Sequence, residues 1–166
     1  MRVFKAGVFS ALGHDHEIAA PIASGTVDAA GRRVELRFNA ATLRVRDPHV
    51  SDKDRDEIQK TMLGPAVLDV DRYPEMAFRS TAAEPAEANS WTVTGELALH
   101  RQTRSITVQV REQNGHYIGT ARLKQSDFGI KPIKVAGGAV TVKDEVRIEF
   151  DVQLAQGQSP DNSVGK

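Results

Sequence analysis

Apolar and polar residues alternate along most of this chain with a period of two. The clearest stretches are residues 34–40 and 91–99, where every second residue is apolar or glycine. This period is typical of strands that bury one face of a sheet. Further stretches of the same kind lie at residues 2–9, 18–29, 76–81, 106–110, 117–123 and 140–154. The pattern therefore predicts about eight strands.

The connections between these strands are short, and one of them carries a specific turn signal. Asn114-Gly115 suits a type I′ hairpin, because both residues tolerate the positive φ that this turn requires. Parallel pairing would need crossover helices, and only one helix-forming stretch is present. The prediction is an all-β fold of eight antiparallel strands, closed as a barrel or packed as a sandwich.

Residues 51–63 predict a single short amphipathic helix. Ser51 can cap the first N–H groups, and the acidic residues that follow suit the positive end of the helix dipole. Ile58 and Met62 lie four residues apart on one face, and Gly64-Pro65 ends the helix. We expect Ile58 and Met62 to close over a ligand, with the plugging of one barrel end as the alternative.

Small residues share one face of the predicted strands with large apolar residues; Gly95, Gly119 and Ala121 are the examples. If this face points inward, side chains leave the interior partly empty, and an eight-stranded barrel can hold one ligand. Alternatively, the glycines mark bends or bulges. The alternation predicts a ligand site lined by Phe38, Phe78, Trp91, Val93, Leu97, Val108, Ile148 and Phe150, with Ile58 and Met62 from the helix.

Composition narrows the classes of partner. The 22 basic and 22 acidic side chains give a formal net charge of zero, and aromatic residues make up only 5% of the chain. No nucleic acid partner is expected, because a basic surface and a stacking platform are both missing. The chain has no cysteine, which excludes disulfides and thiolate metal sites.

Length and hydropathy favour one domain that does not span a membrane. The 166 residues suit a single domain, and no apolar run approaches the ~20 residues of a membrane-spanning helix. We expect a barrel domain over residues 1–155 and a disordered tail over residues 156–166, where the alternation stops.

The segment Gly13-His14-Asp15-His16-Glu17 is the strongest candidate for metal chemistry. In an extended chain His14 and His16 face the same way and could bind one divalent ion. A catalytic zinc site needs three protein ligands, so a third donor must come from elsewhere. The candidates are Glu17, His49, His100 and His116. A metal-dependent enzyme using His14 and His16 is thus one hypothesis, and a polar turn or barrel rim is the other.

No other motif indicates catalysis. The chain has no P-loop, dinucleotide fingerprint or Gly-x-Ser-x-Gly elbow, and Asp127-Phe128-Gly129 lacks the companion motifs of a protein kinase. His100 is expected to be hydrogen-bonded near a turn at residues 101–103. Arg122 and Lys124 are expected to be solvated; if either pointed inward, it could meet a ligand head group. The sequence favours a binding protein, with no cofactor required, over an enzyme.

Four blocks follow one another along the chain: Asp54-Arg55-Asp56-Glu57, then residues 67–78, 91–100 and 125–130. Together they resemble the YceI-like family. The resemblance implies a lipocalin-like, eight-stranded antiparallel barrel with one short helical insertion. It also implies an apolar interior that binds a long isoprenoid or similar amphiphilic lipid, usually without enzymatic activity. It supplies no catalytic residues, and it leaves a homodimer open.

The resemblance also bears on location, because members of the family are often exported to the periplasm. The first nine residues do not form a signal peptide, since Lys5 and Gly7 interrupt a short apolar core. The chain also begins where the first strand should already be running. Either the start is truncated or the protein is cytoplasmic. The histidine-rich residues 13–16 are a second departure from the family's pattern.

Overall fold

The computed structural model describes residues 4–11, 14–28, 30–135 and 140–154. The expected tail at 156–166 lies outside this range. The strands are β1 (Phe4–Ala11), β2 (His14–Ala20), β3 (Ile22–Asp28), β4 (Arg33–Asn39), β5 (Arg44–Val45), β6 (Glu75–Pro85), β7 (Ser90–Leu99), β8 (Gln102–Gln113), β9 (His116–Lys124), β10 (Lys134–Val135), β11 (Val140–Thr141) and β12 (Glu145–Gln153). The helices are α1 (Asp52–Leu63) and the short 3-10 helices η1 (Ala40–Thr42) and η2 (Gln125–Phe128).

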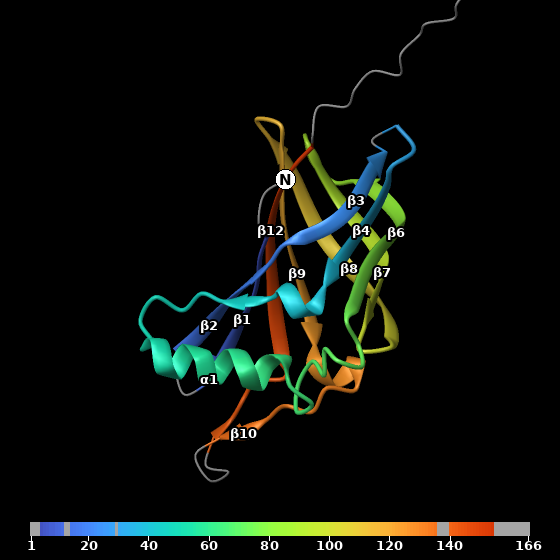
Figure 1. Cartoon of the computed structure of the whole chain (residues 1–166). Helices are drawn as coiled ribbons and strands as arrows, with labels where there is room; N and C mark the ends of the chain where they lie inside the picture. The colour runs from blue at the N-terminus through green and yellow to red at the C-terminus, as the bar shows by residue number, and fades with distance from the viewer. Residues whose placement is uncertain (1–3, 12–13, 29, 136–139, 155–166) are drawn as a thin grey trace, which may run out of the picture.

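Ten of the strands form one curled sheet in the order β3-β4-β6-β7-β8-β9-β12-β1-β2-β5, and β10 and β11 form a separate small hairpin (Figure 1). Pro21 joins β2 directly to β3, and this bent strand pairs with β1 at one end and with β4 at the other. Counted as one, β2 and β3 bring the sheet to eight long antiparallel strands plus the two-residue β5. The predicted eight-stranded antiparallel fold is confirmed.

Two details of the strands differ from the expectation. The strand predicted at residues 18–29 begins earlier, at His14, and is interrupted at Pro21, which lacks the N–H needed for the sheet's hydrogen bonds. The β7–β8 turn consists of His100 and Arg101, both with positive φ (52° and 59°), and strand pairing resumes at Gln102. The Asn114-Gly115 hairpin is confirmed, with φ values of 54° and 78°.

Helix α1 forms as predicted and lies at one end of the curled sheet (Figure 1). The Ser51 side chain accepts a hydrogen bond from the Asp54 N–H at 3.1 Å, which caps the first turn. The side-chain amide of Gln59 then attaches the helix to the sheet edge. It donates to the Leu43 carbonyl and accepts from the Val45 N–H, both at 2.8 Å. In this way Gln59 covers the polar edge of the short strand β5.

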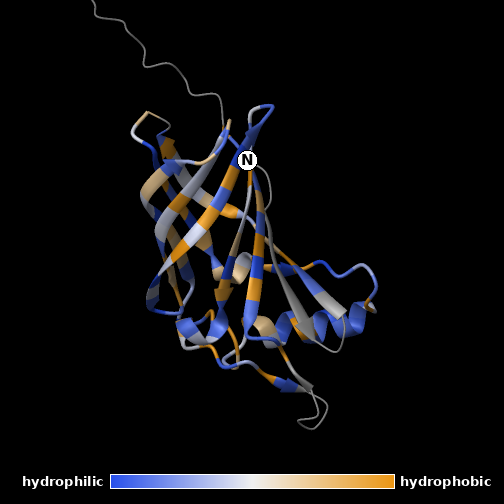
Figure 2. Cartoon of the chain, turned by 180° about the vertical axis from the view of Figure 1, so that it is seen from behind, coloured by the Kyte–Doolittle hydropathy of each residue, from blue (hydrophilic) through white to orange (hydrophobic). Residues whose placement is uncertain are grey.

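The buried apolar residues form two clusters, in keeping with the alternating hydropathy of the strands in Figure 2. The first cluster, called here the end core, lies where α1 and η2 meet the sheet. It consists of Ile18, Ala20, Leu43, Val45, Met62, Val67, Leu68, Phe128 and Ile130. The second cluster lies on the inner face of the middle strands and is built on Val93, Val108 and Ala121.

Asp144 holds η2 in place from the loop that precedes β12. Its carboxylate accepts hydrogen bonds from the Ser126 hydroxyl at 2.6 Å and from the Ser126 N–H at 2.8 Å. These two hydrogen bonds lower the pKa of Asp144 from its ordinary value of 3.8; burial opposes them, and the positive charge of Lys124 adds to the lowering. The carboxylate is therefore more stable as an anion in the folded protein than in the unfolded chain.

Replacing Asp144 with asparagine is expected to reduce stability at neutral pH and to have less effect in acid. Because the folded-state pKa is lowered, the charged carboxylate stabilises the fold fully above the ordinary pKa of 3.8, and this stabilisation is lost as the pH falls through the folded value. Urea unfolding of the wild type and Asp144→Asn at neutral pH and at about pH 2.5 measures the change. A stability difference that grows toward acid pH would contradict this assignment.

Candidate ligand cavity

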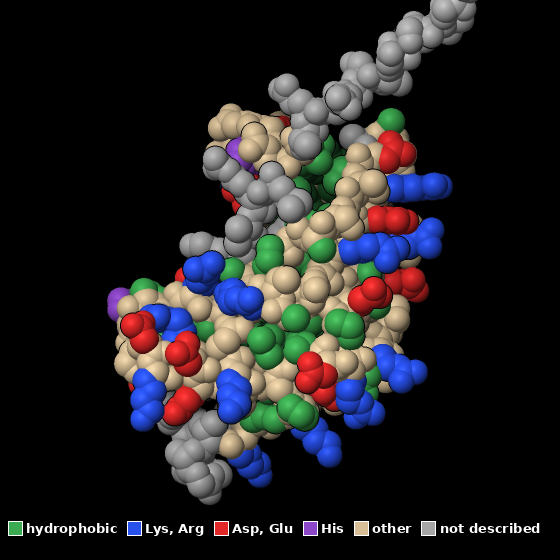
Figure 3. All heavy atoms as spheres, in the orientation of Figure 1, with side chains coloured by type: hydrophobic (Ala, Val, Ile, Leu, Met, Phe, Trp, Pro, Cys, Tyr) green, Lys and Arg blue, Asp and Glu red, His purple; other side chains and the backbone are tan. Residues whose placement is uncertain are grey.

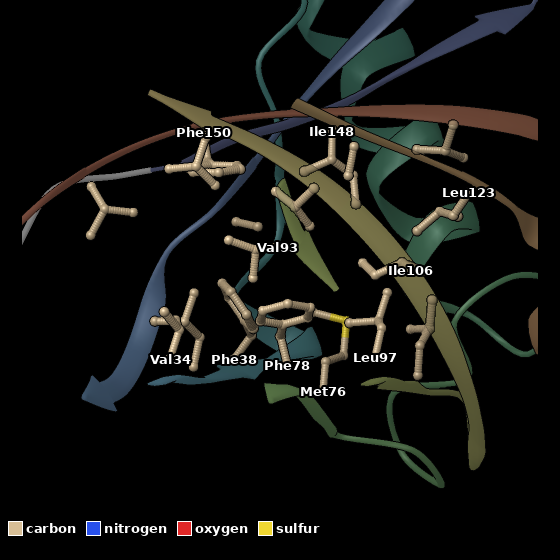
Figure 4. Close-up of a pocket in the computed structure, with 18 of the residues that line it drawn as sticks. Val34, Phe38, Met76, Phe78, Val93, Leu97, Ile106, Leu123, Ile148 and Phe150 are labelled. Carbon is tan, nitrogen blue, oxygen red and sulfur yellow. The ribbon is translucent and has the colours of Figure 1, made fainter. Parts of the chain in front are cut away.

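The inner face of the sheet encloses an apolar cavity of about 340 Å³. Figure 4 shows side chains from β4, β6, β7, β8, β9 and β12 that converge on this space. All eight strand residues expected at the ligand site line it: Phe38, Phe78, Trp91, Val93, Leu97, Val108, Ile148 and Phe150. From the helix, Met62 lines the cavity, whereas Ile58 packs against the end core.

Two glycines let aromatic rings lie close to the inner wall of the sheet. Gly119 pairs with Phe150 on β12, and a Cβ atom at Gly119 would lie 2.4 Å from the Phe150 ring. A Cβ atom at Gly95 would likewise lie 2.5 Å from the ring of Phe78. Both glycines are buried on the cavity side, as expected if the face that they share with large apolar residues points inward. A bulge also lies opposite Gly95, on β6, so the expectation that the glycines mark bends or bulges holds at this position as well.

The cavity is open at the end of the barrel opposite α1. Figure 3 shows a recess lined by hydrophobic side chains at that end, while α1 occupies the other end (Figure 1). Met62 is 5% exposed and belongs to the end core, so the helix closes the inner end of the cavity. Of the two roles expected for the helix, the arrangement matches the plug and not a closure over the mouth.

The histidine-rich segment is part of a strand and not a turn, because β2 begins at His14. The side chain of His14 lies outside the described residues. The Nδ1 atom of His16 lies 2.5 Å from Oδ2 of Asp47, and the other carboxylate oxygen of Asp47 accepts a hydrogen bond from the Glu17 N–H. His16 is therefore paired with a carboxylate that is 3% exposed.

The other histidines proposed as metal ligands lie elsewhere. His100 contacts the Phe128 carbonyl (Nδ1 to O, 3.2 Å), and His116 pairs with Asp151 at 2.7 Å. Within the described part of the chain, no group of three or more His, Cys, Asp or Glu side chains is placed to hold a metal ion. Arg122 is solvated, as expected, and pairs with Glu145 at 3.3 Å.

Sequence reasoning missed Asp47, which joins β2 to α1. Its carboxylate binds β2 through His16 and Glu17, and its main-chain carbonyl accepts two hydrogen bonds from the Arg55 guanidinium, at 3.2 and 2.9 Å. Arg55 also donates to the Val50 carbonyl at 3.0 Å. Arg55 lies in the first of the four family-like blocks, but nothing in the sequence analysis pointed to its contact with Asp47.

Replacing Asp47 with alanine is expected to cost about 2 kcal/mol of stability, because the partly buried Glu17 N–H and His16 ring would lose their acceptor. Glu35→Ala is the matched control, since the Glu35 carboxylate pairs with Arg79 on the solvated surface. Its removal is expected to lower stability by less than about 0.5 kcal/mol. Urea unfolding of both variants measures the two losses. Equal losses would mean that Asp47 has no special structural role.

A curled antiparallel sheet around an apolar cavity defines the class of lipocalin-like barrels, which hold small ligands in their interior. The family model of the YceI-like domain matches residues 6–154, and the chain belongs to this family. Within the described residues, no helix has the length and apolar character needed to cross a membrane. Family and fold are consistent with a binding or carrier protein.

Relatives and solved structures agree with the assignment of the chain to the YceI-like family. The chain is 35% identical over 96 residues to a UPF0312 protein of Pseudomonas savastanoi, a match that covers 52% of this chain and 44% of the relative. It is 29% identical over 108 residues to a UPF0312 protein of Vibrio parahaemolyticus, covering 59% and 56%. The chain thus spans about half the length of the curated relatives it matches.

Two crystal structures share the fold. BcnA of Burkholderia cenocepacia superposes with a TM-score of 0.72 at 23% identity, over 90% of this chain and 94% of that one. The YceI protein of Campylobacter jejuni superposes with a TM-score of 0.62 at 12% identity, over 84% and 85%. At these identities the likeness concerns the fold alone.

Proposed function

We propose that this protein is a non-enzymatic carrier that holds an isoprenoid or similar amphiphilic lipid inside its barrel. The observation that carries the proposal is the cavity of about 340 Å³, whose lining is apolar except for a few residues. A polar substrate would bind poorly in such a cavity, because polar groups taken into it would lose their hydrogen bonds to water. An apolar chain would gain about 25 cal/mol for each Å² removed from water.

The size of the cavity limits how much of a ligand it encloses. Its 340 Å³ lies near the lower end of the range of about 300–1,000 Å³ typical of small-molecule sites. One apolar chain fits this description better than a lipid with two. The remainder of a longer isoprenoid would extend through the open end, opposite α1.

The alternative of a metal-dependent enzyme finds no support in the contacts of the described residues. His16 is held by Asp47, and His100 and His116 are bound to other partners.

Native mass spectrometry of the gently purified protein tests the proposal directly. We expect an additional mass that disappears on denaturation and that organic extraction recovers as a lipid. After delipidation, the protein is expected to bind the apolar fluorophore N-phenyl-1-naphthylamine, and geranylgeraniol should displace it. A protein that carries no additional mass and does not bind the fluorophore would contradict the carrier function.

A further inference from the structure

Among the described residues, the charged side chains that line the cavity come from one side of its mouth. Among the lining residues, those with charged side chains are Asp28, Arg32 and Arg33, and all three belong to the β3–β4 hairpin. This hairpin lies at the open end of the barrel, opposite α1 (Figure 1). Any amphiphile whose apolar part lies inside the cavity would place its polar part near this hairpin.

The carboxylate of Asp28 already has a structural partner. Its Oδ1 atom accepts a hydrogen bond from the Gly31 N–H at 2.8 Å, which closes the turn. The described residues offer neither Arg32 nor Arg33 an ion pair or a side-chain hydrogen bond. Two guanidinium groups with unused donors therefore lie beside an apolar opening.

Alternation along β4 separates the roles of the arginines. Val34, Leu36 and Phe38 line the cavity, whereas Glu35 and Arg37 lie on the exposed face between them. Both arginines line the cavity, but Arg33, the first residue of β4, has the outward phase of Arg37. Arg32 lies in the turn that precedes β4, where its positive φ (52°) ends the alternation of the strand. Because the outward phase applies to Arg33 and not to Arg32, Arg32 is the first candidate to meet a ligand.

We propose that Arg32, with a smaller contribution from Arg33, binds the anionic head group of an amphiphile whose apolar chain lies in the cavity. The inference rests on the proposed carrier function and specifies its ligand class as a carboxylate or a phosphate ester. A guanidinium group suits either, because its planar donors match two oxygens at once. A neutral alcohol would gain less, and a cationic head group would be repelled.

The exposure of the two arginines determines how large the preference for an anionic head group should be. Both arginines are exposed, so water screens the interaction, as it does for pairs on a protein surface. We expect dodecanoate to bind about fivefold more tightly than dodecanol, which corresponds to about 1 kcal/mol. Because screening grows with ionic strength, the preference is expected to shrink at about 0.5 M salt.

Displacement of N-phenyl-1-naphthylamine tests the proposal with four single-chain amphiphiles of equal length, each below its micelle concentration. They are dodecanoate, dodecyl phosphate, dodecanol and dodecyltrimethylammonium. We expect the two anions to bind most tightly and the cation least, and whichever anion binds more tightly identifies the head group. Arg32→Ala should remove most of the preference for anions, with the remainder due to Arg33, and leave the affinity for dodecanol unchanged.

Arg37→Ala is the matched control, because it removes the same charge from the strand that follows Arg32, on the face away from the cavity. It is expected to keep the full preference for anions. Equal binding of anions and dodecanol by the wild type, or equal losses in the two variants, would overturn the proposal and leave the carrier function intact. If no amphiphile displaced the fluorophore, the carrier function itself would fail.

Discussion

Replacing Ala121 with phenylalanine is expected to abolish the uptake of apolar ligands while the barrel stays folded. Ala121 lies on β9, is 6% exposed and lines the cavity, and its cross-strand neighbours are Val108 and Ile148. A phenyl ring at this position would point into the space that a ligand needs. We expect affinity for N-phenyl-1-naphthylamine to fall by at least about tenfold, because the added ring clashes with any bound chain.

The cavity makes this substitution tolerable for the fold. Extra bulk in a filled core costs about 1–3 kcal/mol, whereas here the ring enters a cavity that the protein's own side chains do not fill, so the cost should lie at or below the lower limit. Thr120→Phe is the matched control, since Thr120 is adjacent on β9 and has the outward phase of the strand. Fluorescence titration, with circular dichroism to check folding, compares the variants. Unchanged binding by Ala121→Phe would place the fluorophore outside the barrel.

Replacing Phe128 with alanine is expected to have the largest effect on stability, a loss of about 3–5 kcal/mol. The Phe128 side chain is fully buried, with 0% exposure, at the centre of the end core between η2 and the sheet. Its loss would leave a cavity among residues held apart by the sheet and by α1. Such a loss is a large part of the 5–15 kcal/mol that typically separates folded and unfolded domains.

Phe128→Leu serves as the comparison, because leucine retains most of the apolar volume and is expected to cost clearly less than alanine. Urea unfolding at neutral pH measures both losses. If Phe128→Ala lowered stability by less than about 1 kcal/mol, the end core would not be a main source of stability. The tripeptide Asp127-Phe128-Gly129 is thus explained by packing and by the positive φ of Gly129 (73°).

Local patterns predicted the elements of the fold because each of them depends on neighbouring residues. The alternation along β4, β7 and β9, the Asn114-Gly115 turn and the capped helix from Ser51 could all be read from a few residues. The same alternation placed the expected lining residues together on one face, because successive side chains of a strand point to opposite sides, but it did not say which face points inward. Burial of the apolar face then determined which side points inward.

Contacts between distant parts of the chain could not be read in this way. The pairing of His16 with Asp47 joins residues 31 positions apart, and it changes the interpretation of a segment that suggested a metal site. The break at Pro21, which lets one strand pair with both β1 and β4, likewise depends on how the sheet curls. Neither feature leaves a periodic signal in the sequence.

The sequence by itself therefore determined the strands, the helix and the apolar lining, because backbone geometry and hydropathy act locally. Only the tertiary structure decided that α1 closes the end of the cavity opposite its opening and that Arg32 lies at the opening. Both outcomes follow from the way in which the sheet curls and the strands pair, and these depend on contacts between residues far apart in the chain. The apolar character of the cavity lining follows from the local sequence, whereas the positions of its closed and open ends depend on the whole barrel.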